Sequence, residues 1–216
     1  SFLSWRAFIR NTAFFEHLTD DFLEPCDGYE LHANALEDDP QNSQILLFAA
    51  QHSFVNEGDA DFGQTLTMKA LEQNPSNAIA WGLLSNLQIL QGEPGAARVS
   101  AERGLLLSQG QECLPTLSIF ALMAQIANKD YQVAMTTGRL GVLSGAKCQA
   151  IRRYLFALFH AMDMPQQRDR ELGLLREREP DFHLGLLTSD KYPMKTRHRM
   201  HWAEKLIHEP ALAQEI

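Results

Sequence analysis

An eight-residue pattern occurs twice in the chain, and it constrains the fold more than any other feature. Residues 35–42 read ALEDDPQN and residues 70–77 read ALEQNPSN, so five of the eight positions agree in the form A-L-E-x-x-P-x-N. The two prolines, Pro40 and Pro75, are about 35 residues apart, and a period of about 20–50 residues indicates an array of stacked units. Each unit of such an array buries its apolar face against its neighbours.

The stretch after Pro75 predicts two antiparallel helices joined by a tight turn. One face of the first helix carries residues at the i, i+3, i+4 spacing, namely Trp81, Leu84 and Ser85. The turn is predicted at residues 92–94, GEP, because glycine suits the end of a helix and proline suits a first helical turn. Small residues follow on one side of the second helix, which lets the first helix pack closely: Ala97, Ala101 and Gly104.

These residues resemble the signature of the tetratricopeptide repeat, a two-helix unit of about 34 residues. The unit after Pro75 matches the signature in order at Trp81, Leu84, Gly92, Ala97, Ala101 and Gly104. The preceding unit matches at Leu47, Ala50, Phe54, Gly58, Gly63, Ala70 and Pro75. The interval from Gly58 to Gly92 equals that from Gly63 to Ala97, and both have the length of the repeat. The resemblance implies an all-α fold, an α-solenoid of antiparallel helix pairs wound into a superhelix.

Two further units are less regular, but their equivalent residues recur at intervals close to the repeat length. The interval from Ala97 to Ala134, in the stretch DYQVA, exceeds the repeat length by about three residues, which predicts an insertion near 108–112. In the last unit Arg168 stands where the family has alanine, so its helix packing is expected to differ. The predicted divisions are a helix pair over 1–42, repeats over 43–76, 77–110, 111–145 and 146–180, and a capping segment over 181–216. Helical patterns between Phe2 and Ile207 predict about twelve helices in all.

The two ends of the chain suggest a more specific resemblance. Residues 5–18 form an amphipathic pattern that leads into the array, and residues 180–207 form a closing segment with the motifs PDFHL and YP. These ends are similar to the regions that follow winged-helix DNA-binding domains or nucleotide-cyclase domains in bacterial regulators. The resemblance implies a non-catalytic interaction or sensory module in signalling or transcription regulation. Because the chain starts at Ser1 without a signal-peptide pattern, we expect a piece of a longer, cytoplasmic protein.

Composition narrows the partners that this segment can have. Nineteen Lys and Arg against 27 Asp and Glu give a net charge of −8, which disfavours direct nucleic-acid binding despite a locally basic stretch at 191–205. No apolar run approaches the ~20 residues that span a bilayer. The cysteines Cys26, Cys113 and Cys148 are widely spaced, without a CxxC pair, and predict neither a zinc ribbon nor a disulfide framework.

The sequence contains no motif of an enzyme or a cofactor site. GxSxG, the Walker loop, GxGxxG and HExxH are all absent, so we expect no catalysis and no cofactor. His198, His201 and His208 form the one histidine cluster. The i, i+3 pair could share a metal, but zinc needs further ligands and the neighbouring arginines repel a cation. A solvated basic helix is the preferred interpretation, and no metal site is predicted.

Binding in a concave groove is the remaining hypothesis, because the first helix of each unit lines the inner curve of such a solenoid. The register of Gly58 and Gly92 predicts a groove lined by Ile45, Phe48, His52, Val55, Ile79, Gly82, Asn86, Ile89, Ile119, Phe120, Met123, Ile126 and Arg153. The lining is mostly apolar, which favours a hydrophobic peptide or helix, or part of the same polypeptide. Tetratricopeptide domains that clamp a peptide carboxylate use Lys, Arg and Asn here, and only Asn86 and Arg153 are of that kind.

Two alternatives remain open at this stage. A tight superhelix could bury the same residues, and His52 and His160 could then be structural histidines and not polar contacts of the groove. The chain could also be an assembly scaffold in which an exposed apolar stripe drives homo-oligomerisation.

Overall fold

The computed structural model describes residues 34, 36–54, 58–110, 113–144 and 149–188, and these residues are all-α. The helices, in chain order, are α3 Ser43–His52, α4 Ala60–Gln73, α5 Ala78–Leu90, α6 Pro94–Leu107, α7 Leu114–Ala127, α8 Tyr131–Ser144, α9 Gln149–Ala161, α10 Pro165–Arg176 and the 3-10 helix η2 Leu184–Thr188. The predicted number of about twelve is therefore too high for the described part of the chain, which holds eight α-helices and one 3-10 helix. The helices predicted before residue 33 and after residue 192 lie outside the described residues.

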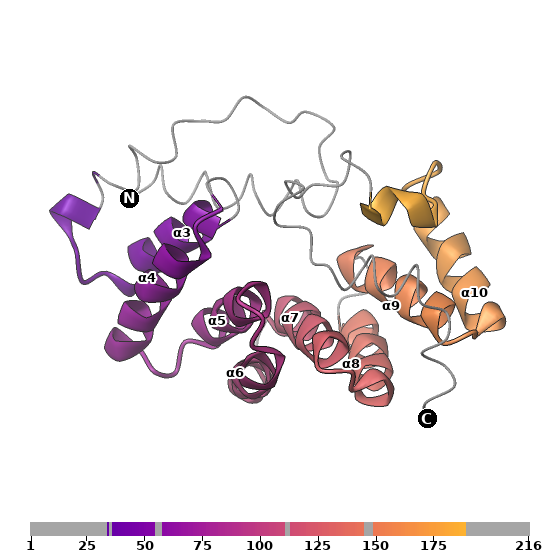
Figure 1. Cartoon of the computed structure of the whole chain (residues 1–216), viewed down its shortest axis with the longest axis horizontal. Helices are drawn as coiled ribbons and strands as arrows, with labels where there is room; N and C mark the ends of the chain where they lie inside the picture. The colour runs from indigo at the N-terminus through magenta and orange to yellow at the C-terminus, as the bar shows by residue number, and fades with distance from the viewer. Residues whose placement is uncertain (1–33, 35, 55–57, 111–112, 145–148, 189–216) are drawn as a thin grey trace.

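Consecutive helices pack antiparallel against one another along the chain. Figure 1 shows them following each other in a curved row, from α3 and α4 at one end to α9 and α10 at the other. The helices form four pairs, and one pair falls within each of the ranges 43–76, 77–110, 111–145 and 146–180. The all-α prediction is thus confirmed, and so is the sequential packing of antiparallel helices.

The turn within each helix pair has one residue in the left-handed backbone region, at equivalent positions in all four pairs. These residues are Gly58 (φ 81°), Gly92 (φ 78°), Lys129 (φ 65°) and Asp163 (φ 50°). The first and last of the three intervals between them are equal, and the middle one is about three residues longer. The extra residues of the longer interval lie between α6 and α7, where residues 108–113 make a longer link than residues 74–77 between α4 and α5.

Backbone hydrogen bonds show that three of these turns are alike in detail. The amide after the left-handed residue donates to the carbonyl five residues earlier: Glu93 to Gln88 at 2.8 Å, Asp130 to Gln125 at 2.8 Å, and Met164 to Phe159 at 2.9 Å. This is the Schellman arrangement, which satisfies carbonyls at a helix end. Each first helix of these three pairs therefore ends in the same way before the chain reverses into the second helix.

Lys129 and Asp163 occupy positions at which the first two turns use glycine. A side chain in the left-handed region costs about 1 kcal/mol. We expect Lys129→Gly to raise the free energy of unfolding by about 0.5–1 kcal/mol, measured by urea denaturation. The reverse change at the equivalent turn, Gly92→Lys, should lower it by about 1 kcal/mol. A loss of stability in both variants would contradict this account of the turns.

Small side chains let the second and third pairs pack closely. Four alanines, each at most 1% exposed, form the contact between α6 and α7: Ala97, Ala101, Ala121 and Ala124. Larger apolar clusters lie on either side, one over α3 to α5 and one over α7 to α10 with Phe182. In α10 the buried residue is Leu175, and Arg168 pairs with its neighbour Asp169 at 2.7 Å. Helix α10 thus packs on α9, although Arg168 stands where the resemblance to the tetratricopeptide repeat implies alanine.

Candidate functional site

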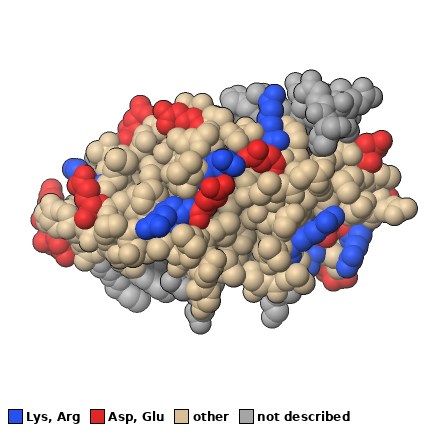
Figure 2. Space-filling view, turned by 90° about the horizontal axis from the view of Figure 1, so that it is seen from below, with Lys and Arg blue, Asp and Glu red and all other residues tan. Residues whose placement is uncertain are grey.

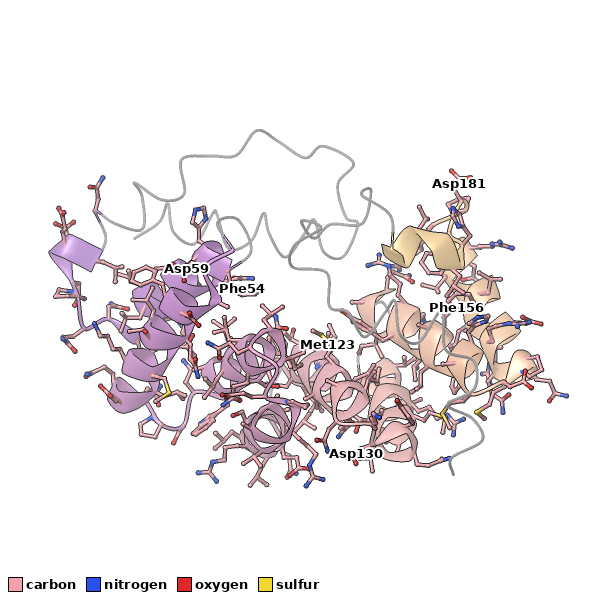
Figure 3. The ribbon with its side chains drawn as sticks, in the orientation of Figure 1. Phe54, Asp59, Met123, Asp130, Phe156 and Asp181 are labelled. Atoms are coloured by element: carbon pink, nitrogen blue, oxygen red, sulfur yellow. The ribbon has the colours of Figure 1, made fainter. Side chains whose placement is uncertain are left out.

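The predicted groove residues come from the first helix of each pair, and the structure divides them into two groups. Half-buried side chains are Phe48, His52, Ile79, Ile89, Ile119 and Phe120, and buried residues are Ile45, Gly82, Asn86, Met123, Ile126 and Arg153. Val55 lies outside the described residues. Figure 3 places Met123 on the side of α7 that faces the inside of the curved row. The predicted lining is therefore partly a surface and partly an interior.

The contact between Phe120 and Gly82 shows how a lining residue becomes part of the packing. A Cβ atom at Gly82 would lie only 2.4 Å from Cδ2 of the Phe120 ring and 2.8 Å from Cδ1 of Leu117. The absence of a side chain at Gly82 therefore admits the ring of Phe120 against α5. Phe120 thereby joins two helix pairs, although Phe120, Phe48 and Ile79 all lie outside the main apolar clusters.

Arg153 is a core residue, since its side chain is 1% exposed. Its guanidinium contacts the carboxylate of Glu179 through Nε, at 3.1 and 3.2 Å, and through Nη2, at 2.5 Å. A planar guanidinium that contacts both oxygens of a carboxylate has the bidentate geometry of a strong ion pair. The sequence predicted Arg153 as a member of the groove lining, and in the structure its guanidinium pairs with Glu179.

Asn86 is a buried polar residue of the predicted lining. Its side chain is 5% exposed, and its Oδ1 atom accepts no hydrogen bond from that part of the protein. The same holds for Ser85 Oγ beside it and for Gln125 Oε1 on α7. A buried acceptor without a donor costs about 1–3 kcal/mol, so such an atom favours binding of an N–H or O–H group.

A cleft of about 710 Å³ lies beside the turns of the first two pairs, away from the predicted lining. Its walls are Gly58, Asp59, Ala60, Asp61, Gln64, Leu90, Gln91 and Glu93. Asp59, which Figure 3 labels, accepts the amide of Phe62 at 2.9 Å and so caps α4, while Gln91 donates to Asp61 at 2.7 Å. The carboxylates of Asp59 and Asp61 therefore already accept hydrogen bonds within the fold.

This cleft was not predicted from the sequence, although the sequence contains a signal for it. Asp59 and Glu93 each directly follow the glycine of a turn, so they are one repeat length apart. Both are N-cap residues of a second helix, where a negative charge is favourable beside the helix dipole. The repeat therefore places acidic residues next to each other along the edge formed by the turns.

Two titratable groups of the described part have shifted pKa values. Burial, and after it the charge of Arg168, lowers the pKa of His160, while Asp163 opposes the shift. The shift favours the neutral form of His160. Burial raises the pKa of the Cys113 thiol, which reduces its thiolate fraction near neutral pH.

Within the described ranges, no three His, Cys, Asp or Glu side chains are grouped so that they could hold a metal ion. The predicted cluster of His198, His201 and His208 lies outside these ranges, as do Cys26 and Cys148. No helix in the described part is long and apolar enough to cross a membrane.

Comparison with protein-family models and with curated proteins finds no match to this chain.

Proposed function

We propose that the chain is a tetratricopeptide-type interaction or sensory module of a larger bacterial regulatory protein, and that it is not an enzyme. The observation that carries the proposal is the repetition of one turn at intervals close to the repeat length, each time between two packed antiparallel helices. A unit of two helices and about 34 residues is the tetratricopeptide period, and stacked units of this kind form extended binding surfaces.

The proposed ligand is an apolar peptide or helix, bound on the inner side of α3, α5 and α7. Half-buried apolar side chains support this choice, namely Phe48, Ile79 and Ile119. Asn86 follows Ile79 by seven residues on α5, and its buried Oδ1 atom accepts no hydrogen bond from the described residues. When the side chain turns toward the surface, a peptide N–H that donates to this oxygen would remove the cost of its burial, which adds a polar requirement to an apolar surface.

The proposal predicts that peptides selected from a random display library on the purified chain carry apolar residues at helical spacing. For the tightest selected peptide, Ile79→Glu should weaken binding at least about tenfold, because a charge would be desolvated against an apolar ligand. Fluorescence anisotropy with the labelled peptide measures the affinity. Met68→Glu is the matched control, since Met68 lies on α4, is 49% exposed and is not part of the proposed surface.

A second variant separates binding from folding. Asn86→Leu removes a buried acceptor and replaces it with an apolar side chain of similar size, so stability should stay equal or rise while peptide affinity falls. A structural asparagine would give the opposite result for stability. If the library yields no peptide, or if the selected peptide binds the wild type and Ile79→Glu equally well, the proposed surface is wrong.

A further inference from the structure

We draw no further inference here: the strongest candidate, the exposed apolar patch of Val133, Leu140 and Leu143 on α8, a helix on the side of the molecule that Figure 2 shows, carries none, because nothing in the described part of the structure shows what covers it.

Discussion

Glu179→Ala is expected to lower the free energy of unfolding by about 3–5 kcal/mol, because it removes the carboxylate that contacts the buried guanidinium of Arg153. Arg153 is 1% exposed and the side chain of Glu179 is 11% exposed, so solvent screens the pair weakly. The carboxylate accepts from both Nε and Nη2, and its loss leaves those donors facing a low-dielectric interior. Urea denaturation followed by circular dichroism measures the effect.

Two controls separate the buried charge from the packing of the side chain. Asp169→Ala breaks the ion pair with Arg168, whose carboxylate partner is 61% exposed, and should cost less than about 1 kcal/mol. The double variant Arg153→Met/Glu179→Leu removes both charges and should be more stable than Glu179→Ala alone. If Glu179→Ala costs no more than Asp169→Ala, the ion pair does not hold the end of α10 against α9.

The sequence predicted the helix pairs where glycine and proline mark the chain. Gly58 and Gly92 set the register of the first two turns, and the same register continues through the third and fourth pairs. Lys129 and Asp163 adopt the left-handed conformation without glycine, so the turn residue itself could not be recognised there. At the turn of Lys129, the repeat was recognised only from the spacing of the small residues that follow, Ala134 in particular.

The sequence could not say which residues of the predicted lining are buried, because helical periodicity indicates which face a residue shares and not what lies opposite that face. Phe120 is packed against α5 because Gly82 presents no side chain to it, and this contact joins the first helices of two different pairs. The burial of Arg153 could not be predicted from the pattern of its own helix, because its partner, Glu179, follows α10 and is 26 residues away. Contacts between different helix pairs depend on how neighbouring pairs stack. The residue pattern within one pair does not contain this information.

Helix α8 packs closely against its neighbours at Gly141, so a larger residue at this position should strongly lower the free energy of unfolding. A Cβ atom at Gly141 would lie 2.7 Å from Cβ of Ser118 on α7 and 2.9 Å from Cδ1 of Ile151 on α9. The Ser118 Cβ is held by the backbone of its helix and cannot turn aside. We therefore expect Gly141→Leu to lower the free energy of unfolding by about 3 kcal/mol, although leucine is favoured over glycine in a helix by about 0.8 kcal/mol.

The same substitution at Gly173 gives the matched control. Gly173 lies in α10, is exposed, and has no atom within 4 Å of an added Cβ. Gly173→Leu should raise the free energy of unfolding by about 0.5–1 kcal/mol, because only the helix propensity changes. Both variants are measured by urea denaturation under identical conditions. If Gly141→Leu lowers the free energy of unfolding and Gly173→Leu raises it, the close contact of α7, α8 and α9 stabilises the third pair. If both variants raise the free energy of unfolding equally, α8 can move away from its neighbours at little cost.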